Sequence, residues 1–296
     1  MANISEIKGR KKSVNDIMKI TNAMYLISSS KMKKAKKQLD DTEDYFHTLQ
    51  QTIAHILKHT PHTSNAYFHR RENIPAEKRK KGYLIITGDK GLCGAYNHNV
   101  LKLAEEEISK GGEIKLFIIG QVGRMYFSRK GIPCEDYFRY TAQNPTMYRS
   151  REISEILLQK FIDEELDDLY VIYTDMPTAM TEVPKVLQIL PVRREKFSNL
   201  KNSGQMHIHH TATFDPSPMV VMDHLVPNYV NGLLYGAMVE AFAAEQHARM
   251  TAMDSATKSA KDMLHDLDLA YNRARQAGIT QEITEVVSGA KNRTKR

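Results

Sequence analysis

A glycine-rich stretch from Thr87 to Asn97 contains the residues most suggestive of catalysis. It reads TGDKGLCGAYN and lies between a predicted strand and a predicted helix, where the backbone amides of such a turn can hold a phosphate. It lacks the Gly-Lys-Ser/Thr ending of a P-loop, and its glycines do not have the spacing of a dinucleotide-binding motif. We interpret it as a structural turn, with nucleotide binding as the alternative.

The histidines and carboxylates of the chain do not form a recognisable catalytic or metal-binding motif either. The only histidine cluster is His207, His209 and His210, whereas a zinc site needs three or four ligands with supporting hydrogen bonds, and we expect an exposed loop. Glu282 and Glu285 share a face of a predicted helix, but no catalytic pair of carboxylates can be identified. We therefore predict no catalytic residue, metal or cofactor in this chain.

Composition indicates a folded protein of one large or two small domains, because the chain has 296 residues. No apolar run is long enough to span a membrane, and the first residues lack the pattern of a signal peptide. Two cysteines, Cys93 and Cys134, are too few for a disulfide framework and indicate a reducing compartment.

The positive charge is concentrated near the N-terminus. Residues 1–37 contain ten basic side chains against two acidic ones, within a net charge of +7. Such a stripe suits nucleic acid or an acidic protein partner.

Long helical patterns occur at both ends of the chain, and the basic side chains of residues 1–37 lie on the first of them. From Ile4 to about His59, and again from about Pro227 to Ala290, apolar or small residues recur at alternating steps of three and four. The second helix would be roughly 95 Å long, more than a domain of this size can cover. We therefore predict that the two helices pack as an antiparallel coiled coil, the alternative being two amphipathic helices on a globular core.

The predicted seams are defined by position. The first comprises Ile4, Ile7, Lys11, Val14, Met18, Thr21, Tyr25, Ser28, Met32, Ala35 and Leu39, and the second Val239, Phe242, Met253, Ala256, Ala260, Met263, Leu267, Ala270, Ala274 and Ala277, interrupted by Gln246 and Arg249.

The middle of the chain has an α/β pattern. Strands are predicted at 83–87, 114–119, 169–173 and 185–190, with helical stretches between most of them, which is typical of a mainly parallel, Rossmann-like sheet. Residues 219–222 could be a fifth strand or the lead-in to the last helix. We expect three segments: 1–59 as the first coiled-coil helix, 60–222 as the α/β domain with an exposed basic loop at 60–82, and 223–296 as the second coiled-coil helix and a basic tail.

The run ITQEITEVVSGA at 279–290 resembles the C-terminal signature of the gamma subunit of F-type rotary ATP synthases. Stretches at 20–32, 88–97, 248–253 and 271–276 are similar to other parts of the same family, so the resemblance covers the whole chain. It implies that the terminal helices form a rotor shaft inside a hexamer of alternating alpha and beta subunits. It also implies that the α/β domain lies against the epsilon subunit and the c-subunit rotor ring, and that catalysis belongs to beta.

The resemblance also assigns positions. Arg275, Gln276 and Thr280 match residues that contact a loop of the beta subunit, Glu282 and Glu285 match neighbouring polar positions, and Arg249 matches another residue of this set. Met24 matches a position that faces an acidic loop of beta, with Lys31 nearby. For each of these residues a solvated helix surface is the alternative interpretation.

The resemblance further implies a non-catalytic subunit without cofactor, bound to the cytoplasmic side of the cell membrane, and no nucleic-acid partner. A nucleotide-binding enzyme with long helical arms is the alternative. Two features depart from the family: Gly278 lies within the last helix, where glycine costs about 1 kcal/mol relative to alanine, and residues 291–296 form a basic tail that we expect to protrude.

Overall fold

The computed structural model describes residues 4–60, 65–69, 71, 73–178, 181–198, 215 and 217–293. The chain divides into two compact units, one made of Met1–Ser29 with Arg249–Arg296 and the other of Ser30–Ala248. We call them the terminal unit and the central unit. Their boundaries cut through both long helices. Of the three predicted segments, 1–59, 60–222 and 223–296, the first ends where the first long helix ends, at His59, whereas the boundary at 222/223 lies inside the last helix.

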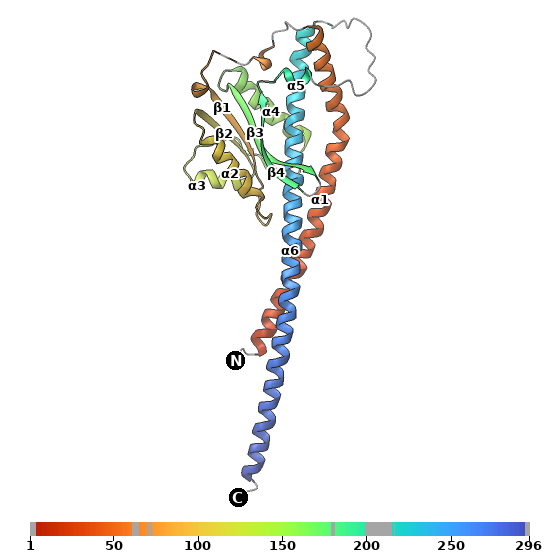
Figure 1. The fold of residues 1–296 in the computed structure, drawn as a ribbon, viewed down its shortest axis with the longest axis vertical. Coiled ribbons are helices and arrows are strands. Elements are labelled where there is room, and N and C mark those ends of the chain that lie inside the picture. The colour runs from red at the N-terminus through yellow and green to blue at the C-terminus, as the bar shows by residue number, and fades with distance from the viewer. Residues whose placement is uncertain are drawn as a thin grey trace. The chain divides into compact units, whose positions relative to one another are not determined.

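Two long helices, α1 (Ile4–His59) and α6 (Pro218–Arg293), carry the two ends of the chain (Figure 1). In the terminal unit their contacts join Ile4 to Gly278, Lys8 to Tyr271, Lys11 to Asp268 and Thr21 to Thr257. The residue number falls along α6 as it rises along α1, so the predicted antiparallel pairing is confirmed.

The same direction holds within the central unit. There Ala35 packs with Val239 and Ala243, and Phe46 lies against Gly232. Both helix segments belong to one compact unit, so this pairing is part of its core.

The predicted seam of α1 is confirmed. All of its positions are buried or partly buried except Lys11. Polar members fit because they find partners: the Thr21 and Thr257 hydroxyl oxygens are 2.7 Å apart, and Thr21 also donates to the carbonyl of Met18.

The seam of α6 is wrong at two positions. Met263 is 52% exposed and Leu264 is partly buried in its place; likewise Ala277 is exposed and Gly278 partly buried. Steps of three then four and of four then three both follow the helical period, so the sequence pattern does not choose between neighbouring positions.

The start of α6 is also corrected, from about Pro227 to Pro218. A proline inside a helix removes one backbone hydrogen bond and costs about 3 kcal/mol. The preceding turns nevertheless stay helical because Met222 and Val226 are fully buried in the core. Residues 219–222 are therefore the lead-in to this helix.

Within the described residues, the sheet has four strands in the order β2-β1-β3-β4. They are β1 (Lys80–Ile86), β2 (Glu113–Ile119), β3 (Asp168–Thr178) and β4 (Thr181–Leu190). The first three are parallel, which confirms the mainly parallel prediction. The fourth is antiparallel to β3 and forms a hairpin with it, because no helix intervenes to carry the chain back.

Helices cover both faces of the sheet. The helices are α2 (Tyr96–Ile108), α3 (Gln121–Arg129), α4 (Met147–Ile162) and the short α5 (Glu195–Ser198), with 3-10 turns η1 (Ala66–Phe68) and η2 (Ala76–Lys78). Successive side chains of a strand point to opposite faces. Accordingly Leu84 and Ile86 belong to a core with α1, α4 and α6, and Tyr83 and Ile85 to one with α2 and α3.

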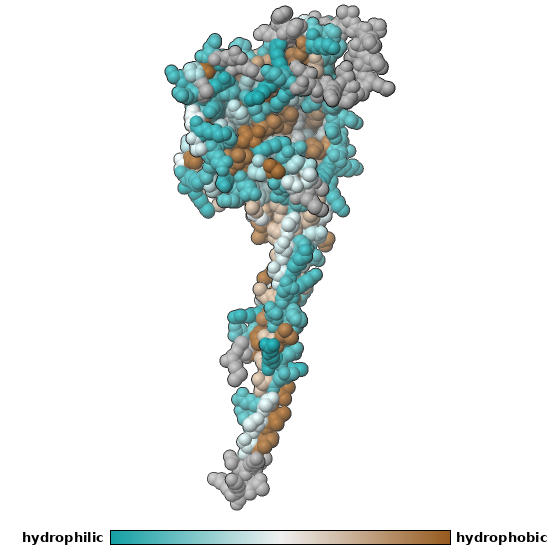
Figure 2. Space-filling view, viewed as in Figure 1, coloured by the Kyte–Doolittle hydropathy of each residue, from teal (hydrophilic) through white to brown (hydrophobic). Residues whose placement is uncertain are grey.

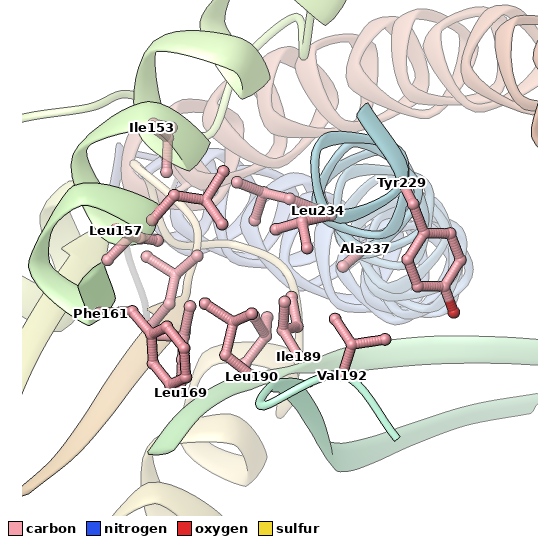
Figure 3. Packing of buried hydrophobic residues seen from close by; sticks show 14 of the residues in the cluster. Ile153, Leu157, Phe161, Leu169, Ile189, Leu190, Val192, Tyr229, Leu234 and Ala237 are labelled. Carbon is pink, nitrogen blue, oxygen red and sulfur yellow. The ribbon is translucent and has the colours of Figure 1, made fainter. Parts of the chain in front are cut away.

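Figure 3 shows how the larger core joins α6 to the sheet. Leu234 and Ala237 of α6 lie near Ile189 and Leu190 of β4, while Leu157 of α4 closes the same cluster. The central segment of α6 is thus an integral part of the α/β core.

The expectation of an exposed, solvated connection at 60–82 is wrong for its two described arginines. The guanidinium of Arg71 bonds Asp167 at 2.8 Å, and that of Arg79 makes two bonds to Asp168 at 2.7 and 3.1 Å. Both carboxylates are buried at the start of β3. The basic connection is therefore held against the start of β3, one of the two central strands.

Candidate interaction surface

The glycine-rich turn between β1 and α2 is held by its own hydrogen bonds. The Asn97 carboxamide accepts from the Gly88 amide at 2.8 Å, and Asp89 accepts from the amides of Gln121 and Ala142 at 3.1 Å each. The carboxylate of Glu245 lies 3.2 Å from where a Cβ on Gly88 would stand. An acidic side chain beside the turn opposes phosphate binding, and the geometry favours the structural interpretation.

Other sites of chemistry are not found where the chain is described. No group of three or more His, Cys, Asp or Glu residues among the described positions could hold a metal ion, and His207, His209 and His210 lie outside them. Among the described helices, none has an apolar stretch that could cross a bilayer.

The end of α6 is an exposed surface of mixed character. Beyond Gly278, the residue opposite the first described turn of α1, every side chain from 279 to 288 is exposed. Four are large and apolar, namely Ile279, Ile283, Val286 and Val287, the third of them 71% exposed. They form the brown stripe along this helix end in Figure 2. Apolar side chains at such spacing along a helix are typical of an interface with another chain.

Four of the predicted contact residues lie among these apolar ones. Positions 275, 279, 282 and 286 form one row at steps of four, three and four, and positions 276, 280, 283 and 287 form the adjacent row. Arg275, Gln276, Thr280 and Glu282 therefore share their face of the helix with the apolar stripe. A partner that packs on the stripe meets these polar groups as well.

Glu285 is placed differently. It continues the line of Ala274 and Gly278, the side on which α1 packs in the terminal unit. Its carboxylate accepts a hydrogen bond of 3.0 Å from Gln281. It belongs to this helix end but not to the stripe.

Arg249 differs from the other candidates because it is buried. Only 8% of it is exposed, next to the equally buried Gln246 and Glu245. Contact between Arg249 and another chain stays a prediction, and this burial restricts it to a small part of the side chain.

On α1, Met24 is partly buried and belongs to a row with Ile17, Ile20 and Ile27. These three isoleucines are each more than half exposed, next to the seam rather than in it. Sequence reasoning missed them, although their steps of three and four along the helix were a readable signal. Lys31 lies in the central unit and is partly buried.

The basic stripe is partly neutralised. Arg10 pairs with Glu6 at 2.8 Å, and Lys11 pairs with Asp268. Among the described residues, the lysines at 31, 33, 34, 36 and 37 form no ion pair. These ammonium groups are available to an acidic partner, for which they would supply steering more than affinity.

Comparisons with known proteins agree in one family. The family model described as ATP synthase matches residues 3–292. The ATP synthase gamma chain of Ruminiclostridium cellulolyticum is 45% identical over 289 residues, which cover 97% of this chain and 98% of that one.

Solved structures show the same fold. The rotor of the Euglena gracilis mitochondrial ATP synthase contains a chain with TM-score 0.63 and 15% identity, covering 93% of this chain and 98% of its own. A chain of the Tetrahymena thermophila mitochondrial central stalk/c-ring has TM-score 0.57 and 22% identity, covering 80% and 99% respectively.

Proposed function

This chain belongs to the ATP synthase gamma-chain family, and from that premise we propose that it is the central rotor shaft of a rotary ATP synthase. It would couple ion flow through a membrane rotor ring to ATP synthesis or hydrolysis in a surrounding catalytic hexamer. The observation that carries this proposal is the exposed, mixed face at the end of α6. On such a helix end the apolar groups can supply binding energy, and the charged groups can make binding depend on the conformation of the partner.

The mechanism follows from asymmetry. The antiparallel pair of the terminal unit has different side chains on each side and no threefold symmetry. It therefore acts as a ligand whose affinity differs for each conformation of the surrounding subunits, and rotation changes which conformation is favoured.

The free energy needed to shift a partner subunit between conformations must come from its contacts with this face of α6. Moving a two-state site from 1:99 to 99:1 takes roughly 5.5 kcal/mol of differential contact energy. Burying a large aliphatic side chain contributes about 1.5–3 kcal/mol. Two residues of the stripe that are buried against one conformation and exposed against the other could therefore supply most of this difference. The charges of Arg275 and Glu282 would then make binding specific for a partner surface of complementary charge.

The proposed partners are the alpha and beta subunits around the terminal unit, and the epsilon subunit and the c-ring for the α/β domain. Met24, Lys31, Arg249, Arg275, Gln276, Thr280, Glu282 and Glu285 are proposed contacts with beta. The chain would itself be non-catalytic and peripheral on the cytoplasmic side of the membrane. The clustering of four of these residues with the apolar stripe supports the assignment.

The test replaces the polar groups within the stripe. In the intact complex, Arg275→Glu combined with Gln276→Glu should lower ATP turnover at least about tenfold, since about 1.4 kcal/mol of transition-state stabilisation corresponds to that factor. Ser288→Glu is the control, because Ser288 is exposed at the same helix end but lies on the other side of the helix from both rows. Turnover is measured together with the amount of complex assembled.

Equal turnover in the double variant and the control would remove the assigned contact. The enzyme alternative has its own test: equilibrium dialysis of the purified chain should show no tight binding of ATP. Recovery of the chain only as a free protein, never with larger ATPase subunits, would overturn the rotor proposal itself.

A further inference from the structure

A pocket of about 600 Å³ lies at the outer strand β2 of the sheet, between α3 and residues 131–139, which follow this helix (Figure 1). We call it the α3 pocket. Sites for small molecules typically have volumes of about 300–1,000 Å³. No residue of the long helices α1 and α6 lines it, so it is distinct from the candidate interaction surface.

Backbone bonds and packing hold the walls of the α3 pocket in place. Gly131 turns the chain after α3 with a φ of +68°, a conformation that favours glycine. The chain then runs back along β2, where the Glu135 amide donates to the carbonyl of Leu116 at 2.9 Å. Phe138 is only 1% exposed and packs edge-to-face on Phe117. The pocket is thus largely preformed.

Four charged side chains line the pocket, two of each sign: Arg124, Glu135, Asp136 and Arg139. Among the described residues, none of the four forms an ion pair. A purely anionic or purely cationic ligand would meet two charges of its own sign here. The lining therefore favours a ligand that carries both signs, because such a ligand complements both pairs of charges.

Backbone carbonyls orient the two guanidinium groups. Nη1 of Arg124 donates to the carbonyls of Tyr140 and Ile118 at 3.2 and 3.5 Å. Nε of Arg139 donates to the carbonyl of Asp136 at 2.9 Å. Within the described part of the chain, the other two nitrogens of each group make no bond. A planar guanidinium with two such nitrogens suits a carboxylate, to which it can donate twice.

The α3 pocket also has an apolar lining. Met125 of α3 is 46% exposed, and Ile132 and Pro133 of the following segment line the same pocket. A methionine side chain is flexible and adapts to apolar groups of different shape. A ligand with a hydrophobic portion next to its charged groups therefore fits this lining.

We propose that the α3 pocket binds a free amino acid with a large apolar side chain. The carboxylate of the ligand is held by Arg124 and Arg139. Its ammonium group lies at Asp136 with the charge of Glu135 nearby, and its side chain packs on Met125. The end of a peptide carries only one of the two charges and is a poorer match.

Methyl NMR of the full chain, labelled with ¹³C at the methionine methyl groups, tests this proposal. The Met125 signal is the one that is missing in Met125→Leu. Three probes share a phenylethyl body: phenylalanine carries both charges, 3-phenylpropanoate lacks the ammonium group, and 2-phenylethylamine lacks the carboxylate. Phenylalanine should shift the Met125 signal saturably, with a Kd on the order of 1 mM for so small a ligand. Each of the other two should bind at least about tenfold more weakly, because it loses one charge-assisted contact.

Substitutions assign each charge of the ligand to its partner. Arg139→Gln should raise the Kd of phenylalanine about tenfold without weakening the binding of 2-phenylethylamine. Asp136→Asn should have a similar effect on phenylalanine without weakening the binding of 3-phenylpropanoate. Arg129→Gln is the matched control, because it removes an exposed positive charge of α3 that does not line the pocket. The other methionine signals show whether each variant is folded.

Alkylation of Cys134, which also lines the pocket, gives an independent readout. Phenylalanine at about ten times its Kd should slow the reaction of Cys134 with N-ethylmaleimide about tenfold, and the same concentration should slow it only about twofold in Arg139→Gln. Mass spectrometry of the peptide that contains Cys134 measures the rate.

Three results would overturn the α3 pocket as an amino-acid site. They are the absence of a saturable Met125 shift with phenylalanine, equal affinity of Arg139→Gln and the unmodified chain, and equal or tighter binding of either probe with a single charge. An unchanged alkylation rate of Cys134 would contradict it as well. None of these measurements depends on rotation or on other subunits, so this proposal and the rotor proposal can fail separately.

Discussion

At the scale of single residues, one glycine determines how closely the two long helices approach in the central unit. A Cβ built on Gly232 of α6 would lie 1.9 Å from Cε1 of Phe46 on α1, and 2.2 and 2.7 Å from two further ring atoms. No side chain fits in that space unless the aromatic ring moves. The packing of α1 on α6 here depends on the missing methyl group.

Gly232→Ala should therefore destabilise the chain by about 1–3 kcal/mol, the usual cost of overpacking a core. Gly236→Ala is the matched control on the same helix, because a Cβ there meets nothing within 4 Å. It should stabilise by roughly 0.5–1 kcal/mol through helix propensity. Urea unfolding measures both, and the same sign for the two variants would contradict this view of the contact.

At the scale of elements, buried ion pairs join the connection before β1 to the start of β3. Arg71 donates to Asp167 and to the carbonyls of Leu166 and Phe161 at 2.6–2.8 Å. The side chains of Arg71 and Asp167 are only 14% and 4% exposed. Burial alone would raise the pKa of Asp167, but the Lys80 amide and Arg71 outweigh it and keep the pKa below its ordinary value.

Asp167→Ala should destabilise by about 3 kcal/mol, since it leaves a buried guanidinium without its counter-charge. Glu6→Ala, which breaks an exposed pair of α1, should cost less than about 1 kcal/mol. Because the folded pKa of Asp167 is depressed, its contribution is present above the ordinary value of 3.8 and is lost as the pH falls below it. Urea unfolding at neutral and acidic pH should thus show the difference between the unmodified chain and Asp167→Ala shrinking in acid.

These pairs illustrate what the sequence could and could not predict. Periodicity was sufficient for the antiparallel helices, because residues such as Ile7, Thr21 and Ala35 repeat over many turns. It was insufficient for Met263 against Leu264, where neighbouring positions fit the period equally well. Arg71 and Asp167 are far apart in sequence, and only the folded sheet brings them together, so a basic run was interpreted as a solvated loop.

The candidate interaction surface was also predicted only in part. The resemblance provided Arg275, Gln276, Thr280 and Glu282, but not the fact that they share a face with the apolar stripe. That follows from the helix period, once the limit of α1 opposite Gly278 is known.

At the scale of the whole molecule, the segments of α6 differ in how much of their surface is packed against other parts of the chain. Its segment in the central unit is buried in the core, its segment from 249 to 278 is paired with α1, and residues 279–288 are exposed throughout. Helical segments of fewer than about 12–15 residues are marginal in water without packing. The isolated chain should therefore show amide protection that decreases from the core segment to the exposed end.

Hydrogen exchange along α6 measures this gradient. In the assembled complex, protection of 279–288 should rise to that of the paired segment, because a partner covers the apolar stripe. Equal protection of these residues in the free and assembled chain would mean that the stripe contacts nothing.

The pairing of α1 with the distant part of α6 also determines when the terminal unit can fold during synthesis on the ribosome. Lys11 meets Asp268, and Thr21 meets Thr257, so this pairing cannot form until residue 268 has been translated. Ile4, on the seam of α1, is translated more than two hundred residues before Gly278, which it faces. Ala35 and Val239, which pack together in the central unit, are both translated before Thr257, so we expect their contact to form first and to shorten the loop that the terminal pairing must close.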